Sequence, residues 1–305
     1  MNITKYAFLI AMILFSFICQ ANKEKEQLIW LTDDSEDLVN LNSPNKQVSI
    51  GTDTTNLVLQ ALSEFDIDIQ LVQIPRASML MKAMDNVCLS NRVKTKARLK
   101  DNIFSLPVNI FPSLRLYYMP TQKSALEQGI DERLFTDRGE LKSLASLFTV
   151  YPEAILAMTK GRSFGDIIDN QLEQVPERNK MTRAGDGRYH AIIQMLLKGR
   201  IDFIIHFPVE IRQELKDLPK QTNLSSVSLA NTSEYIVGHI ACSDSELGRE
   251  VIAKVNAKLM QLYQDRAYYQ AHRRYLPESD LNNFARYYKE VFGTEVPKRT
   301  LTPMK

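Results

Sequence analysis

An apolar run near the N-terminus constrains this chain more than any other feature. Residues 7–18 contain a single polar side chain, Ser16, and Lys5 supplies a positive charge before them. The run ends after 12 residues, whereas a helix needs about 20 apolar residues to cross a bilayer. Cys19 and Ala21 then place small side chains at positions −3 and −1 of a cleavage site. The pattern predicts a secretory signal peptide over residues 1–21, cleaved after about Ala21.

A retained membrane anchor and a lipid on Cys19 are the alternatives to simple cleavage. The charged segment 22–26 stops the apolar run too early for an anchor. Ile18 is branched and bulky at the position where lipoprotein signals usually carry Gly, Ala or Ser. We therefore expect a protein that is exported to the periplasm, with 284 of its 305 residues left after cleavage.

The charge balance and the metal-binding residue types exclude several function classes. The chain has 38 Lys and Arg against 36 Asp and Glu, which is too small an excess to neutralise a nucleic-acid backbone over a large surface. Its four histidines lie far apart, and Cys88 and Cys242 are not a C-x-x-C pair, so we expect no metal and no cofactor. In an oxidising compartment, a Cys88–Cys242 disulfide and two separate thiols both remain open.

Strand-like and helix-like patterns alternate along the mature chain. The expected strands are 27–31, 67–72, 86–89, 154–158, 201–206 and 234–242. The expected helices are 54–65, 77–83, 161–172, 188–197, 247–264 and 281–291. Such alternation predicts an α/β protein built from βαβ units. The polar segment 121–141 divides it into two similar lobes.

Four short motifs, in order, resemble those of a known family. Thr95 to Arg98, followed by Phe104 to Pro107, resembles a "T-x-x-R … F-S-x-P" segment. The stretch 160–165 with Asp169 resembles a Gly- and Ser-containing turn that opens the second lobe, and 195–202 resembles "L-x-x-G-R-x-D". In these motifs, over nearly the whole mature chain, the sequence resembles the bacterial extracytoplasmic solute-binding proteins of family 3. These are the type II periplasmic binding proteins best known for polar amino acids.

The resemblance implies a specific architecture and role. Two hinge strands would join the lobes, with the chain leaving the first near Tyr117 and returning near Glu234. Residues 22–117 and 233–305, including the C-terminal helices, would form lobe 1, and 118–232 lobe 2. The lobes would close on a small solute in the cleft between them, where carboxyl ends of strands meet. The partner would be an inner-membrane ABC transporter or a sensor, and we expect a monomer.

The first-lobe candidates for ligand binding are Arg98, Thr95, Arg76, Trp30 and Asp33. In the family, the arginine that matches Arg98 grips the ligand's carboxylate, for which a planar guanidinium is suited. Without the resemblance, the alternating basic run 92–100 indicates a solvated surface. Arg76 follows the second strand, and Trp30 and Asp33 flank the end of the first, where cleft residues belong. The alternative interpretations are that Arg76 is a surface residue and that Trp30 belongs to the core.

The second-lobe candidates begin in the turn Lys160, Gly161, Arg162 and Ser163. Its backbone N–H groups and charges suit an anion at a helix N-terminus, and a plain turn without ligand is the alternative. The same turn matches G-x-S-x-G, the nucleophile elbow of α/β hydrolases, up to Gly165. A secreted serine hydrolase, with Asp202 and His239 or His272 completing the triad, is therefore an alternative function. A sensor or a dehydratase on the same fold is a further one, although no convincing acid–base pair predicts an enzyme.

Phe207 marks a departure from the family pattern. It stands where an amino-acid binder has an acidic residue that holds the ligand's ammonium group, a task phenylalanine cannot perform. Glu210, one turn later, either reaches the cleft or is a surface carboxylate. We therefore expect the solute to be small and anionic or amino-acid-like, without requiring an α-amino acid.

Overall fold

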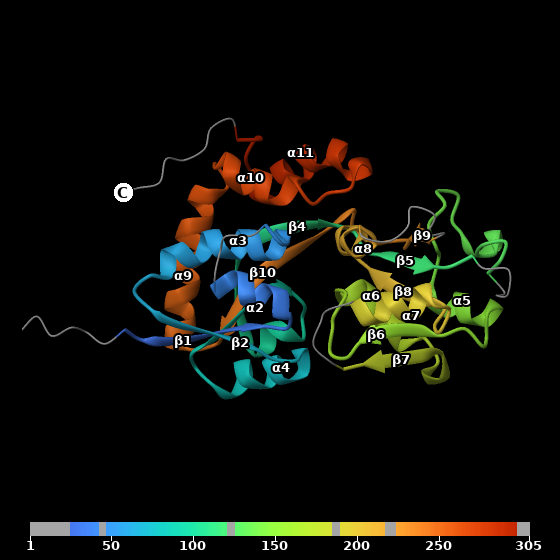
Figure 1. Ribbon diagram of the computed structural model, residues 1–305, viewed down its shortest axis with the longest axis horizontal. Helices are drawn as coiled ribbons and strands as arrows, with labels where there is room; N and C mark the ends of the chain where they lie inside the picture. The colour runs from blue at the N-terminus through green and yellow to red at the C-terminus, as the bar shows by residue number, and fades with distance from the viewer. Residues whose placement is uncertain (1–24, 43–46, 121–125, 185–189, 217–223, 298–305) are drawn as a thin grey trace, which may run out of the picture.

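The protein consists of two lobes, each built around a mixed β-sheet (Figure 1). The computed structural model describes residues 25–42, 47–120, 126–184, 190–216 and 224–297. The predicted signal peptide and Cys19 lie outside these residues. Within the described ranges, no helix is long and apolar enough to cross a membrane.

The sheet of the first lobe has the strand order β2-β1-β3-β10-β4. Its strands are β1 (Gln27–Thr32), β2 (Asp66–Leu71), β3 (Val87–Val93), β4 (Asn102–Pro112) and β10 (Tyr235–Ser243). Strands β1, β2 and β3 are parallel, and β10 runs antiparallel between β3 and β4. The helices of this lobe are α2 (Ser35–Asn42), α3 (Ile50–Leu59), η1 (Gln60–Leu62), α4 (Ile74–Ala83), η2 (Arg98–Lys100), α9 (Glu246–Leu262), α10 (Arg266–Arg273) and α11 (Glu278–Phe292).

The sheet of the second lobe has the order β7-β6-β8-β5-β9. Its strands are β5 (Arg115–Tyr118), β6 (Leu156–Thr159), β7 (Lys180–Arg183), β8 (Phe203–His206) and β9 (Ser225–Ser228). Its helices are η3 (Glu132–Leu134), α5 (Leu144–Val150), α6 (Asp166–Glu173), η4 (Glu177–Asn179), α7 (His190–Leu197) and α8 (Pro208–Leu215). Strand β6 lies parallel to β7 and β8, as expected of a βαβ unit.

The chain crosses between the lobes twice, from β4 to β5 and from β9 to β10. At the crossing, the backbone N–H of Ser113 donates to the carbonyl of Glu234, at 3.0 Å. The expected exit at Tyr117 lies inside β5, where Tyr117 pairs with Ile204 of the second sheet. The chain therefore leaves the first lobe between Pro112 and Arg115, a few residues earlier than expected.

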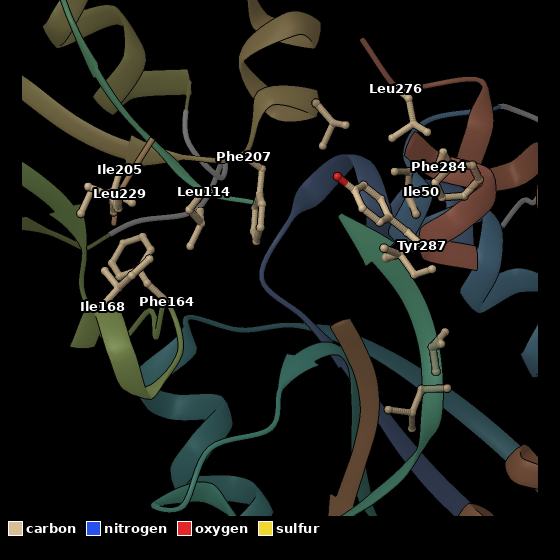
Figure 2. Close-up of a cluster of buried hydrophobic side chains, with 14 of the residues drawn as sticks. Ile50, Leu114, Phe164, Ile168, Ile205, Phe207, Leu229, Leu276, Phe284 and Tyr287 are labelled. Atoms are coloured by element: carbon tan, nitrogen blue, oxygen red, sulfur yellow. The ribbon is translucent and has the colours of Figure 1, made fainter. Parts of the chain in front are cut away.

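A continuous cluster of buried apolar side chains extends through the crossing (Figure 2). Leu114 and Phe207 lie between the group around Phe164 in the second lobe and the group around Ile50 in the first. The ring of Phe207 also packs on Phe111 of β4, with the centroids 5.1 Å apart. The two lobes are thus in apolar contact where the chain crosses between them.

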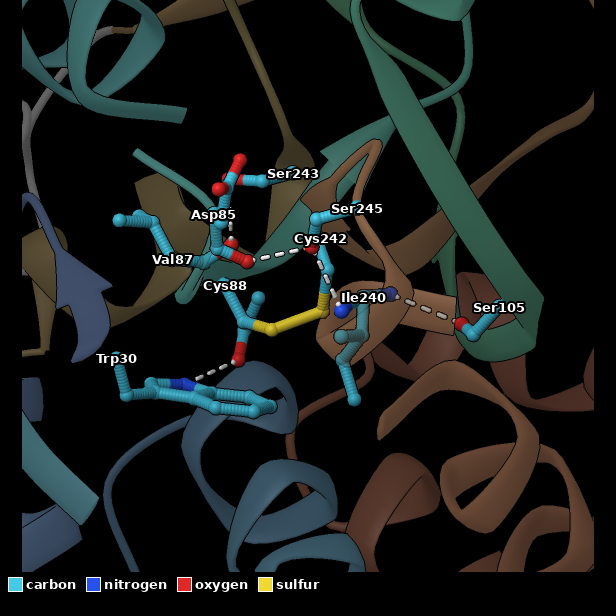
Figure 3. Close-up of a disulfide and its surroundings, with 11 residues drawn as sticks. Trp30, Asp85, Val87, Cys88, Ser105, Ile240, Cys242, Ser243 and Ser245 are labelled. Atoms are coloured by element: carbon cyan, nitrogen blue, oxygen red, sulfur yellow. Dashed lines mark hydrogen bonds between the residues drawn. A yellow bond between two sulfur atoms is a disulfide. The ribbon is translucent and has the colours of Figure 1, made fainter. Parts of the chain in front are cut away.

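A disulfide joins Cys88 of β3 to Cys242 of β10 (Figure 3). The two residues are partners in the antiparallel ladder, with Cα atoms 4.1 Å apart, and both are fully buried. Of the two alternatives that the sequence left open, the structure has the bridge. The disulfide links β3, which carries several cavity residues, to β10, the strand by which the chain returns to the first lobe.

Candidate ligand-binding site

A cavity of about 140 Å³ lies between the lobes. Polar and charged side chains of both lobes line it. From the first lobe these include Thr32, Asp33, Asp37, Thr52, Thr55, Ser90, Asn91, Arg92, Arg98 and Tyr275, and from the second Arg162, Ser163, Glu210 and Gln213. The sequence-predicted residues that meet in this cavity are Asp33, Arg98, Arg162, Ser163, Phe207 and Glu210.

Arg98 lines the cavity from the turn that follows β3. Its Nη1 donates to the carbonyl of Val93 at 2.8 Å, and its backbone N–H donates to Thr95 Oγ1 at 3.3 Å. Burial lowers the pKa of Arg98, and the charge of Asp169 in the other lobe opposes that shift. Arg98 is therefore held toward the second lobe instead of pointing into solvent. Thr95 is buried beneath it and shapes the turn without lining the cavity.

Arg92 lines the same cavity, although the sequence placed it in a solvated basic run. Only 5% of it is exposed, and its Nη2 donates to Ser78 Oγ at 3.1 Å. Burial and then the charge of Arg98 lower the pKa of Arg92 to about 9, against an opposing effect of Asp33. The sequence-based prediction missed Arg92 because it ended this strand at Leu89, whereas β3 continues to Val93.

Arg162 faces the cavity from the second lobe, with Phe164 and Phe207 beside it. Its guanidinium carbon lies 5.5 Å and 5.4 Å from the centroids of these two rings. Its Nη2 is 3.2 Å from Glu210 Oε2, which is also 2.7 Å from Nδ1 of the buried His206. Burial lowers the pKa of His206, and Glu210 opposes the shift. Glu210 therefore lies in the cavity wall and is not a surface carboxylate.

The turn before α6 is organised by its own carboxylate. Asp169 accepts a hydrogen bond from Ser163 Oγ at 2.5 Å and another from the backbone N–H of Phe164 at 2.8 Å. The N–H of Gly165 donates to Ser163 Oγ at 3.3 Å. Some of the donors that we expected to face a bound anion are therefore occupied from within the turn.

The residues of the hydrolase alternative do not come together. Asp202 accepts from the backbone N–H of Ile155 at 2.8 Å. The Nδ1 atoms of His239 and His272 lie 2.9 Å from the carbonyls of Ser105 and Tyr268. In the part of the chain that the structure describes, no group of His, Cys, Asp or Glu side chains has the arrangement of a metal site.

Four further candidates lie away from the cavity. Trp30 is completely buried in the core, and its Nε1 donates to Ser90 Oγ at 3.0 Å (Figure 3). Arg76 is exposed on the first turn of α4. Lys160 lines a separate small hollow between the lobes, and Gly161 faces Pro75 across the same gap. None of these four residues lines the cavity of about 140 Å³.

No family model matches the sequence, and no curated protein sequence matches it. Solved structures do. A mutant of the arginine-binding protein ArgBP from T. maritima superimposes with a TM-score of 0.57 at 14% identity, over 82% of this chain and 95% of that one. A structure from a study of glutathione import via GshT and the cystine ABC importer TcyBC of Streptococcus mutans gives 0.53 at 15%, over 90% and 98%.

A histidine kinase sensor domain described as similar to periplasmic binding proteins gives a TM-score of 0.57 at 11% identity, over 84% of this chain and 97% of that one. All three matches extend over nearly the whole length of the known structure and over both lobes described above. At such low identity they establish the fold. The resemblance inferred from the four motifs is confirmed at that level: this chain has the two-lobed α/β fold of the type II periplasmic binding proteins.

Proposed function

We propose that the protein is an extracytoplasmic solute-binding protein of family 3 whose lobes close on a small anionic or amino-acid-like solute. One observation carries the proposal: Arg98 of the first lobe and Arg162 of the second line a single cavity of about 140 Å³. A ligand that touches both arginines binds the closed state better than the open one. Its differential affinity then shifts the hinge equilibrium toward closure.

The charged groups support the class of solute. Arg98 is anchored by Val93 through one Nη atom, so its remaining N–H groups suit the paired hydrogen bonds that a carboxylate accepts. On the second lobe, Glu210 pairs with Arg162, at 3.2 Å, and it supplies an acceptor one turn after Phe207. An amino-acid-like ligand would place its carboxylate at Arg98 and its cationic group toward Glu210.

The neighbours support two uses for a closed, loaded protein. Their names describe arginine binding, glutathione and cystine import, and a sensor domain. We accordingly propose that the loaded form is recognised in the periplasm by an ABC importer or by a sensor protein, without covalent change to the solute.

A thermal-shift screen of amino acids, organic acids and sugars on the purified mature chain tests the proposal. A solute present at 100 times its Kd stabilises the native state by about 2.7 kcal/mol, which raises the midpoint of a chain this size by roughly 5 °C. The best solute is then titrated by calorimetry into Arg98→Ala and Arg76→Ala. Because Arg76 is exposed and outside the cavity, it is a matched control for loss of one positive charge.

We expect Arg98→Ala to weaken binding by a factor of 100 or more and Arg76→Ala to leave it unchanged. If no solute of any class raises the midpoint, the protein is not a solute receptor. If Arg98→Ala binds as tightly as the wild type, the cavity is not the binding site.

A further inference from the structure

Two positively charged arginines of the first lobe line the cavity without an ion-pair partner among the residues that the structure describes. Within the described residues, neither Arg92 nor Arg98 forms an ion pair. Arg92 donates to the neutral hydroxyl of Ser78, and Arg98 donates to the neutral carbonyl of Val93. Both line the cavity between the lobes, burial lowers the pKa of each, and the charge of Arg98 lowers the pKa of Arg92 further.

Such an arrangement is unfavourable for the protein on its own. A buried charge normally has an ionic partner, because desolvation is otherwise uncompensated. Arg92 is 95% buried, and its Nε atom has no hydrogen-bond partner in the part of the chain that the structure describes. The Nε–H group of Arg92 is thus a buried donor without an acceptor, and the side chain of Arg98 uses Nη1 for its hydrogen bond to Val93.

The carboxylates around the two arginines are engaged elsewhere or act only at longer range. Asp33 acts on Arg92, and Asp169 on Arg98, through charge, and within the described residues neither acid forms an ion pair with these two arginines. Asp169 accepts hydrogen bonds from Ser163 and Phe164 of its own turn.

Asp37, another cavity-lining acid of the first lobe, accepts a hydrogen bond from Thr52. On the second lobe, by contrast, Arg162 has Glu210 as a direct partner at 3.2 Å. Of the three arginines that line the cavity, Arg162 has a direct carboxylate partner, whereas Arg92 and Arg98 have no ion pair within the described residues.

We propose that Arg92 and Arg98 together form a subsite for a dianion, so that the solute carries two negative charges at its first-lobe end, as in a short dicarboxylate or a phosphate monoester. This inference rests on the proposed function and narrows its solute class. A dianion brings one negative charge for each guanidinium group, whereas a monocarboxylate leaves one of the two buried positive charges uncompensated. Arg92, which carries the second half of this site, is a residue that the four family motifs do not contain.

Calorimetric titration with three matched pairs of solutes tests the subsite. Succinate is compared with succinamate, L-glutamate with L-glutamine, and glycerol 3-phosphate with glycerol. Succinamate and L-glutamine each lack one of the two carboxylates, and glycerol lacks the whole dianionic phosphate. The proteins are the mature wild type, Arg92→Gln, Arg98→Gln and the exposed control Arg76→Gln.

We expect at least one dianionic solute to bind the wild type tenfold or more tightly than its partner. Arg92→Gln abolishes that preference, Arg98→Gln weakens both members, and Arg76→Gln changes neither. Whether the carboxylate or the phosphate pair shows the larger ratio identifies the source of the dianion. Circular dichroism verifies that each variant is folded. If Arg92→Gln fails to fold, Arg92→Lys replaces it, because a lysine keeps the charge without the guanidinium fork and reduces the preference.

The outcomes separate this inference from the broader proposal. Equal binding of both members of every pair, or an Arg92→Gln variant that keeps the wild-type preference, overturns the subsite. Binding of some neutral or singly charged solute in the thermal-shift screen would then leave the solute-binding role standing. If no solute in either set binds, both proposals fail.

Discussion

Reduction of the Cys88–Cys242 disulfide is expected to lower the free energy of unfolding by about 4–5 kcal/mol. The bridge closes a loop with a sequence separation of 154, for which the chain-entropy relation gives about 5 kcal/mol. This loop contains the entire second lobe. The lobe's two connections to the first lobe meet where Ser113 bonds to Glu234, at 3.0 Å.

If the second lobe stays folded while the first unfolds, the effective loop is shorter. It consists only of the stretches 88–113 and 234–242, about 35 residues, for which the same relation gives about 4 kcal/mol. The small difference between the two values means that the prediction does not depend on the order in which the lobes unfold.

Urea unfolding followed by tryptophan fluorescence measures the effect. Trp30 is the only tryptophan of the chain and lies fully buried in the first lobe, in the sheet that the disulfide crosses. With a urea slope of about 3 kcal/mol per molar, reduction lowers the midpoint by roughly 1.5 M. The double variant Cys88→Ala/Cys242→Ala is the control, since a reductant cannot change its midpoint.

Equal midpoints for the oxidised and reduced wild type would refute the reasoning that loop closure stabilises the first lobe. Two reactive thiols in denatured, unreduced protein would show that the bridge is not present in solution.

Three further predictions concern the gap between the lobes, a buried histidine and Ser163. Gly161→Ala and Gly139→Ala both place a side chain at positive φ, 78° and 73°, and should each lose about 1–2 kcal/mol of stability. Only at Gly161 does the new Cβ meet the other lobe, 3.1 Å from Pro75, so only this variant should bind the solute more weakly by calorimetry; equal affinities would contradict a closed contact there. Burial lowers the pKa of His272 to about 4, so the unfolded chain binds more protons below pH 6.5 and stability falls as the pH falls. Between pH 7 and 5 the wild type should lose about 2 kcal/mol more than His272→Phe in urea unfolding, and equal losses would contradict a buried neutral imidazole. Ser163 Oγ donates a hydrogen bond to the carboxylate of Asp169 and should not react with a fluorophosphonate probe. Stoichiometric labelling of Ser163, detected by mass spectrometry, would support the hydrolase alternative.

Periodicity predicted most of the regular elements because most of them bury one face. The strands at 27–31, 67–72 and 234–242 correspond to β1, β2 and β10 within two residues at each end. Strand β4 (Asn102–Pro112) was missed, since Pro107 and Pro112 argue against a strand in the middle of a sheet. The sheet order resolves the conflict: β4 is an edge strand, where a missing N–H leaves no ladder position empty.

The cavity residues were harder to predict, because they break the patterns on which prediction rests. Strand β3 was expected to end at Leu89, since the next residues are polar. It continues to Val93 through Asn91, which has a φ of 56°, and it brings Arg92 into a buried position. Polar residues at buried positions and a strained backbone are typical of sites where local rules yield to function. Only the family motif pointed to Arg98, and it had no place for Arg92.

The second lobe shows how a functional group can move by one helical turn and escape a comparison by position. Helix α8 begins at Pro208, and the backbone N–H of Glu210 donates to the carbonyl of Phe207 at 3.1 Å. This turn brings both side chains to the same cavity, so the carboxylate absent at Phe207 is present at Glu210. There its Oε2 lies 3.2 Å from Arg162 Nη2 and 2.7 Å from Nδ1 of His206. Arg92 and Arg98 of the first lobe have no carboxylate at such a distance within the described residues. For the proposed solute, a negative charge would therefore gain more from the first lobe than from the second. We propose that the second lobe contributes mainly by closing over a solute that the first lobe holds.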